Sequence, residues 1–183
     1  SFPTQIATTN ENLIKVPYQI GSSSYIAISA GYSHSVAVTS DYRLFTWGNN
    51  AQGQLGDGTT VNKSSPAQVG TSSWSIISAG GTHTAAITTS GSLFTWGYNN
   101  SGQLGDYTLT NKSSPVQISS VKSTTSQVSF SVLGSGFAST SMAASGNSLF
   151  TWGSSASVGL LGNNDANIGY EILPRQIDIS NIK

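Results

Sequence analysis

Residues Ser92 to Asp106 read SLFTWGYNNSGQLGD, and related stretches occur once before and once after them. The earlier copy, RLFTWGNNAQGQLGD, runs from Arg43 to Asp57, and a looser copy, SLFTWGSSASVGLLGN, runs from Ser148 to Asn163. The tryptophans of successive copies lie 49 and then 56 residues apart. This spacing predicts a tandem array with a period of about 50 residues.

The repeat extends well beyond the tryptophan stretch. A step of 49 residues maps Tyr25 onto Trp74 and His34 onto His83. The third unit keeps this frame more loosely, with Phe130 matched to Trp74 and Ser139 matched to His83. A Pro-x-Gln-apolar segment recurs at Pro17, Pro66 and Pro115, each 49 residues apart, and again at Pro174 after about ten extra residues. We therefore divide the chain into a partial unit (1–24), two units (25–69 and 70–118), and a degenerate third unit with a C-terminal cap (119–183).

Each full unit shows four short apolar runs separated by Gly, Ser, Asn or Asp, which is typical of a four-stranded antiparallel sheet. In the second unit the expected strands are 74–79, 83–88, 93–96 and 116–118. The residues Thr89-Ser90-Gly91 suit a tight hairpin turn. The sequence predicts an all-β fold, because no segment shows helical periodicity.

The stretch after each tryptophan predicts a compact loop. Paired glycines bracket one apolar anchor, Leu55 in the first copy and Leu104 in the second, and glycine permits the positive φ angles that such a loop needs. Asparagines at 49, 50, 99 and 100 can cap the turns with their side chains. The third copy keeps the leucine but loses the asparagines, so we expect a different loop there.

Composition excludes several partners. Charged residues make up 8% of the chain, with seven basic and seven acidic side chains, which is too sparse for a nucleic-acid or anionic-membrane surface. No apolar run is long enough to span a bilayer, and the N-terminus lacks a signal-peptide pattern. The chain has no cysteine. A neutral surface of Ser, Thr, Asn and Gln is typical of extracellular or virion-exposed β proteins, and we expect that setting.

The residues quoted above resemble the repeat of the regulator of chromosome condensation family. The resemblance rests on the openings at 30–35 and 79–84 (A-G-x-x-H-[ST]), the core L-F-x-W-G-x-N-x-x-G-Q-L-G, and the following S-S-P-x-Q segment. It covers about residues 16 to 179. It implies a β-propeller, usually seven-bladed, in which each repeat forms one blade. Three full blades and a partial N-terminal unit would make an incomplete ring.

Candidate catalytic and metal-binding residues have simpler structural interpretations. His34 and His83 occupy one repeat position, so we expect each to tie a strand start to a neighbouring loop. Asp57 and Asp106 recur 49 residues apart and are assigned to the loop scaffold. The polar run 163–167 departs from a calcium loop, since Ile168 and Pro174 stand where glycine and glutamate are needed. We predict no catalytic, metal or cofactor site and no enzymatic activity.

Two activities known in relatives fit this sequence poorly. Ultraviolet-B sensing uses tryptophans framed by arginines, whereas this chain has only Arg43 and Arg175. Guanine-nucleotide exchange needs a propeller face with specific acidic contacts, and this chain offers few charges. The fold is implied much more strongly than either function.

Loop positions that differ between the units are free to serve a partner. Several carry aromatic residues, and tyrosine and arginine are favoured interface anchors. The candidate partner-binding residues are Tyr32, Tyr42, Arg43, Tyr98, Tyr107 and Phe137.

An incomplete ring would expose an apolar blade face at each end, and such faces need cover. We expect a protein partner, or a second copy of the chain, to supply it. The sequence thus predicts a non-catalytic interaction or structural module in a larger assembly, such as a virion or a bacterial extracellular complex. The alternatives are a secreted protein inhibitor or ligand-binding propeller and, less favoured, a guanine-nucleotide exchange factor.

Overall fold

The structure of the protein, a computed structural model, describes residues 19, 21–121, 128–136, 139–154, 161–162 and 169–177. These residues form strands and contain no helix, which confirms the all-β prediction. Consecutive strands pair in three antiparallel sheets of four strands each. No helix able to cross a membrane is present in this part of the chain.

Each sheet is one blade, and its strands lie side by side in chain order. The first blade consists of β1 (Tyr25–Ala30), β2 (His34–Thr39), β3 (Leu44–Gly48) and β4 (Lys63–Gln68). The second consists of β5 (Trp74–Ala79), β6 (His83–Thr88), β7 (Leu93–Gly97) and β8 (Lys112–Gln117). The third consists of β9 (Val132–Ser135), β10 (Thr140–Ser145), β11 (Ser148–Ser154) and β12 (Tyr170–Ile177).

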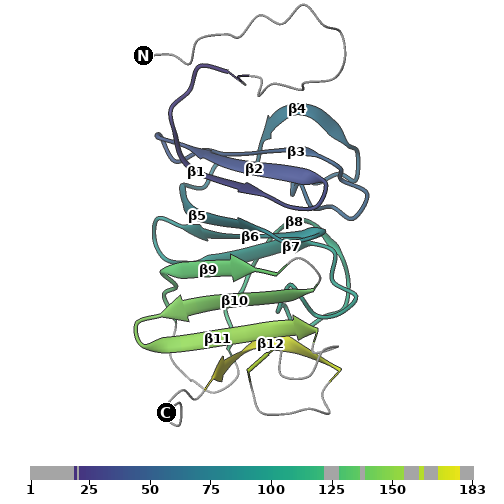
Figure 1. Cartoon of the computed structure of the whole chain (residues 1–183), viewed down its shortest axis with the longest axis vertical. Coiled ribbons are helices and arrows are strands. Elements are labelled where there is room, and N and C mark those ends of the chain that lie inside the picture. The colour runs from purple at the N-terminus through teal and green to yellow at the C-terminus, as the bar shows by residue number, and fades with distance from the viewer. Residues whose placement is uncertain are drawn as a thin grey trace, which may run out of the picture.

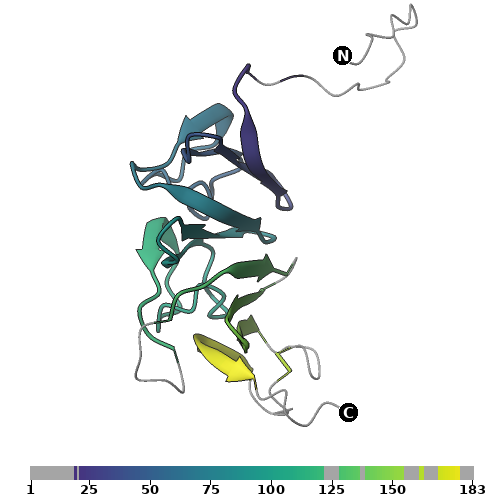
Figure 2. The same ribbon diagram turned by 90° about the vertical axis from the view of Figure 1, so that its left-hand side faces the viewer.

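The three blades are stacked along the long axis of the molecule (Figure 1), and the perpendicular view shows the same order (Figure 2). Strand β5 packs against β1 and β2, and β9 packs against β5 and β6. The blades therefore approach one another most closely at their first strands. The predicted units of 25–69, 70–118 and 119–183 have their limits between strands, whereas the predicted unit 1–24 lies almost wholly outside the described residues.

Strand bounds in the second blade differ from prediction mainly at β8. We expected a strand over 116–118, but β8 begins at Lys112, because Gly97 pairs with Lys112 beyond an irregularity in the ladder. The strand therefore contains Pro115. A proline is tolerated there because β8 is the edge strand, where one side of the backbone needs no partner.

The third blade corrects one part of the predicted repeat register. His34 pairs with Gly48 and His83 with Gly97, but the residue paired with Gly153 is Thr140 rather than Ser139. Counted between equivalent ladder pairs, the β9–β10 connection (Ser135 to Ser141) is one residue longer than the β5–β6 connection (Ala79 to Thr84). The β10–β11 connection (Ala144 to Leu149) is one residue shorter than the β6–β7 connection (Ile87 to Leu93). The two length differences cancel, so the spacing between tryptophans of successive repeats does not reveal either of them.

Apolar side chains fill the space between adjacent blades. Between the first two blades the buried residues are Val36, Val38, Leu44, Val69, Trp74, Ala86 and Trp96. Between the second and third they are Ile87, Leu93, Ile118, Phe130, Ala143, Phe150 and Trp152. Each core thus combines one face of a blade with the opposite face of the next, so most burial depends on contact between blades.

Candidate functional site

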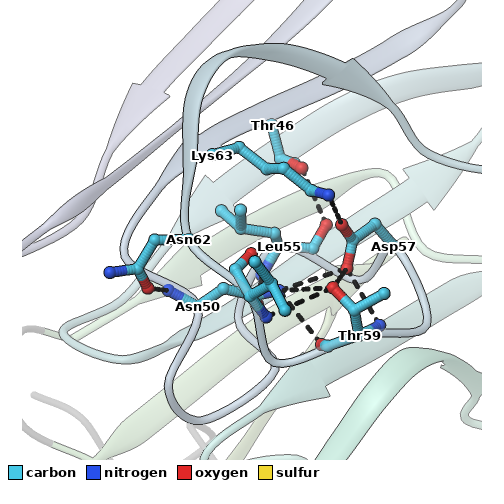
Figure 3. Close-up of polar contacts among 8 residues, drawn as sticks. Thr46, Asn50, Leu55, Asp57, Thr59, Asn62 and Lys63 are labelled. Carbon is cyan, nitrogen blue, oxygen red and sulfur yellow. Dashed lines mark hydrogen bonds and ion pairs between the residues drawn. The ribbon is translucent and has the colours of Figure 1, made fainter.

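The loop after β3 is organised around the buried side chain of Asn50 (Figure 3). Its Nδ2 donates to the carbonyl oxygens of Thr59 and Val61 at 3.0 and 3.2 Å, and its Oδ1 accepts from the backbone N–H of Leu55 at 2.9 Å. The carbonyl of Leu55 in turn accepts from the Thr46 hydroxyl at 2.8 Å. One amide side chain therefore closes the loop and seats Leu55 in the core.

Asp57 belongs to the same network, as the sequence predicted. Its Oδ1 accepts from Asn50 Nδ2 at 3.1 Å and from the Thr59 hydroxyl at 2.7 Å, and its Oδ2 lies 3.3 Å from Lys63 Nζ. Burial raises the pKa of Asp57, but the hydrogen bonds from Thr59, Lys63 and Asn50 outweigh it and leave that pKa lowered. A carboxylate so committed is part of the scaffold and is poorly placed to act as a general base.

The second blade repeats this arrangement with the same residue types. Asn99 Nδ2 donates to Asp106 Oδ1 at 2.9 Å, and Asn99 Oδ1 accepts from the Leu104 N–H at 2.9 Å. Lys112 Nζ lies 3.5 Å from Asp106 Oδ2. Of the four asparagines predicted to cap turns, Asn50 and Asn99 hold the loops through several hydrogen bonds each. Asn49 also caps its turn, because its Oδ1 accepts from the Ala51 N–H at 3.2 Å and from Gln54 Nε2 at 2.7 Å.

Replacing Asn50 by alanine should lower the free energy of unfolding by about 2–4 kcal/mol, because the buried N–H of Leu55 and the carbonyls of the loop lose their partner. Asn100 is the matched control. It is exposed, and the first blade already has Ala51 at that repeat position, so Asn100→Ala should change stability by less than about 0.5 kcal/mol. Urea unfolding of both variants measures the contrast, and equal losses would contradict the assigned role of Asn50.

The loop also holds the next blade through one backbone carbonyl. The carbonyl of Gln54 accepts from the Thr84 hydroxyl at 2.8 Å and from Trp96 Nε1 at 3.0 Å, both on the second blade. These two donors occupy both lone pairs of that oxygen. We call this pair of bonds the carbonyl clasp.

A second carbonyl clasp joins the second and third blades. There the Gln103 carbonyl accepts from the Ser141 hydroxyl and from Trp152 Nε1, each at 2.9 Å. The repeated tryptophan is therefore both an apolar core residue and a hydrogen-bond donor to the preceding blade.

The two histidines extend these clasps in the opposite direction along the chain. His34 Nε2 lies 2.9 Å from the Thr84 hydroxyl, and His83 Nε2 lies 2.9 Å from the Ser141 hydroxyl. Because each hydroxyl proton already goes to a loop carbonyl, the imidazole Nε2 must donate and Nδ1 must carry no proton. The prediction that each histidine ties a strand start to a neighbouring loop is thus corrected. Each histidine contacts a hydroxyl on a strand of the next blade, and that hydroxyl, not the histidine, donates to the loop carbonyl.

Each imidazole is buried in a tightly packed site. A Cβ on Gly80 would come within 2.5 Å of His83 Nδ1, and Gly31 stands in the same relation to His34, at 2.6 Å. This contact explains the glycine of the A-G-x-x-H segment. Burial lowers the pKa of His34 to about 4. Burial and then the charge of His34 lower the pKa of His83 to about 4.

The predicted partner-binding residues do not converge on one surface. Tyr32 lies in the β1–β2 turn, and Tyr98 and Tyr107 lie in the β7–β8 loop, which open at the same end of their blades. The backbone N–H groups of Tyr32 and Tyr98 donate to the carbonyls of Gly81 and Thr82, so these two flank one turn.

Tyr42 and Arg43 lie in the β2–β3 turn, at the opposite end of the blade. Arg43 pairs with Asp41 at 2.7 Å and covers the Phe45 ring at 5.7 Å. Phe137 lies outside the described residues, as does the run 163–167 that was considered for calcium. No group of three potential metal ligands is found in the described part of the chain.

Three of these tyrosines occupy glycine positions of the repeat. Tyr32 corresponds to Gly81, Tyr42 to Gly91 and Tyr107 to Gly58, each at a distance of 49 residues. Tyr42 and Tyr107 also keep the left-handed backbone of their glycine counterparts, with φ of 63° and 66°. Side chains other than glycine are strained in that region, so these tyrosines are held there at a cost of about 1 kcal/mol.

The family model described as regulator of chromosome condensation (RCC1) repeat matches residues 41–87 and 90–136, more than half of the chain. The chain belongs to the regulator of chromosome condensation repeat family. A second RCC1 repeat model matches residues 25–54 and 74–103. This confirms the resemblance read from the A-G-x-x-H and W-G-x-N segments.

Known RCC1-repeat proteins match short parts of the chain. Human E3 ubiquitin-protein ligase HERC2 is 57% identical over 35 residues, which cover 19% of this chain and 1% of HERC2. The ultraviolet-B receptor UVR8 of Arabidopsis thaliana is 40% identical over 57 residues, 31% of this chain and 13% of the receptor. The chain thus covers only a small part of these relatives.

Solved RCC1-type structures match the chain over most of its length. Human WBSCR16 superposes with a TM-score of 0.75 at 22% identity, covering 93% of this chain and 44% of that one. Yeast RCC1 (Prp20), solved with Kap60 bound, gives 0.76 at 20% identity, covering 90% and 40%. At this identity the likeness shows the fold, so the three blades have the β-propeller architecture that the repeat predicted.

Proposed function

We propose that this RCC1-repeat chain is a non-catalytic propeller module that recognises another protein through its surface loops. The observation that carries the proposal is the replacement of loop glycines by exposed tyrosines, two of which keep a left-handed backbone. Tyr32 and Tyr107 are 72% and 70% exposed, so burial within the chain does not offset the strain at Tyr107. Residues kept at a cost to stability favour a role outside the fold.

The chemistry around Tyr107 suits a protein contact. With Val116 and Leu173, Tyr107 lines a hollow of about 100 Å³ where the second blade meets the third. A hollow of this size suits one side chain of a partner and is too small for a typical organic ligand. An aromatic anchor beside such a pocket is a common interface feature.

The wider setting is also a proposal. We infer that the module is a component of a larger assembly, on a virion or in a bacterial extracellular complex, where a partner protein or a second copy covers the outer blade faces. The low charge of the chain and its Ser- and Thr-rich surface support this setting. Yeast RCC1 was solved with Kap60 bound, and a related study of Prp20p concerns its binding to Gsp1p and histones, so propellers of this type do bind proteins.

Substituting Tyr107 with glycine should leave the free energy of unfolding unchanged or raise it by up to about 1 kcal/mol, because the backbone strain is relieved and little packing is lost. The same variant should lose its protein partner. Affinity capture with the wild-type chain and with Tyr107→Gly, each followed by quantitative mass spectrometry, measures the second effect.

The readouts separate the proposal from a structural role. Asn100→Ala serves as the control, because it changes an exposed residue of the same loop without altering an aromatic side chain. If Tyr107→Gly loses more than about 1 kcal/mol of stability, or captures the same proteins as the wild type, the tyrosine is not a recognition residue.

A further inference from the structure

The first blade has an outer face that no described residue of another blade covers. The residues of this face are identified by comparison with the second blade, whose equivalent face is buried against the first blade. Ile28 corresponds to Ile77, which packs into the core between the blades, yet Ile28 is 80% exposed. Trp47 corresponds to the fully buried Trp96 but is only half-buried.

The same face carries both donors of a carbonyl clasp. Ser35 pairs with Trp47 across β2 and β3 in the register in which Thr84 pairs with Trp96 and Ser141 with Trp152. In the second and third blades these pairs donate to one loop carbonyl of the preceding blade. No hydrogen bond from Ser35 or from Trp47 Nε1 is found within the described part of the chain.

The third blade presents the complementary face. The cross-strand row Val132–Ala144–Leu149 stands in the register of Ile76–Ile87–Leu93, the row of the second blade that packs against the third. Val132 is 59% exposed, and Met142, on the same face, is 44% exposed. No described residue of another blade gives this row the cover that its counterpart receives.

We infer that the outer face of the third blade docks onto the outer face of the first blade of a second copy, in the way that successive blades dock within the chain. The inference rests on the proposed function as an interaction module and names the partner at these faces. Such a contact is heterologous, with two different surfaces joined, so it builds a ring if the rotation closes and a filament if it does not.

The contact between copies should be weaker than the contacts within the chain. Thr140 stands where His34 and His83 stand in the other blades, so the third blade has no imidazole to reach the Ser35 hydroxyl of the next copy. Self-association should therefore depend on protein concentration. The average mass measured by light scattering should rise when the protein is concentrated and fall when it is diluted.

Two charge substitutions test the pairing of the faces. Ile28→Glu blocks the face of the first blade and Val132→Glu blocks that of the third, and both residues are exposed, so folding should be retained. Each variant alone should lose all chain growth and stay at the monomer mass. Because each keeps one intact face, an equimolar mixture should form a dimer of twice the monomer mass and grow no further. Val61→Glu, at an exposed residue of the β3–β4 loop, should associate like the wild type.

Trp47 provides a direct reporter. The other three tryptophans, Trp74, Trp96 and Trp152, are at most 2% exposed, so a concentration-dependent blue shift in emission would come from Trp47. Trp47→Phe should remove that shift, and loss of the indole N–H should weaken association by about 3- to 10-fold.

Several results would overturn the inference. They are a wild-type chain that stays monomeric at the highest concentration reached, a mixture of the two glutamate variants that stays monomeric, and a single variant that still self-associates. The proposed loop function is judged separately. Tyr107→Gly should lose its partner and keep self-association, whereas Ile28→Glu should do the reverse.

Discussion

Replacing Trp96 by alanine should lower the free energy of unfolding by about 3–5 kcal/mol, because it removes a fully buried side chain and leaves a cavity between two blades. The indole packs edge-on against Trp74 at 6.0 Å between ring centroids, and its Nε1 donates to the Gln54 carbonyl. A Cβ on Gly56 would lie 2.6 Å from Nε1. The cavity has few ways to close, so the loss should be near the upper end.

The chain contains its own control for this prediction. Trp47 occupies the same repeat position but is half-buried, and no described residue accepts from its Nε1. Trp47→Ala should therefore cost roughly 1–2 kcal/mol in dilute solution. Urea unfolding below the concentration of self-association gives both values. Equal losses would mean that the tryptophan stabilises its own blade and that burial between blades is secondary.

The sequence predicts the blades well because residues that every blade needs recur at the same position in each repeat. Leu93, Phe94 and Trp96 recur in every unit, and the spacing of the copies sets the number of sheets. The start of β8 was not predicted, because Pro115 argues against a strand in the sequence. The structure shows that β8 is an edge strand, which tolerates a proline. The register of Thr140 was missed because a longer turn and a shorter turn cancel in the count.

The candidate site was predictable only in part, for a physical reason. Recurrence shows which residues hold a blade together, and it correctly assigned Asp57 to the loop. It cannot show which side chain meets which across a blade interface. The carbonyl clasp joins Trp96 to a residue 42 positions earlier, so only the fold brings them together. The strain at Tyr42 and Tyr107 likewise appears only in the backbone angles, although the glycines at equivalent positions gave a signal.

Acidification from pH 6.5 to 4 should destabilise the chain through its two histidines. The pKa of His34 and that of His83 are about 4 in the folded state, below the ordinary value of 6.5. In this window the unfolded chain binds protons that the folded chain does not, so stability is complete above pH 6.5 and falls as the pH drops. The slope is about 1.4 kcal/mol per pH unit for each histidine.

The geometry gives the physical cause of this loss. Protonation would place a hydrogen on Nδ1, and Nδ1 of both rings is buried without a hydrogen-bond partner among the described residues. Nε2 already donates to the hydroxyl of Thr84 or of Ser141, so the added charge gains no new bond and costs desolvation.

The slope of stability against pH is a sharper test than stability itself. A variant with both His34→Gln and His83→Gln keeps an amide N–H donor at each position and does not titrate, so it should show little change in unfolding free energy between pH 6.5 and 4.5, whatever its absolute stability. The pKa of Asp57 is lowered from its ordinary value of 3.8, so this carboxylate changes its protonation below the pH range of the comparison. If the wild type and the variant have the same slope, the buried imidazoles are not the acid-sensitive groups, and the contacts between blades must depend on pH through the carboxylates instead.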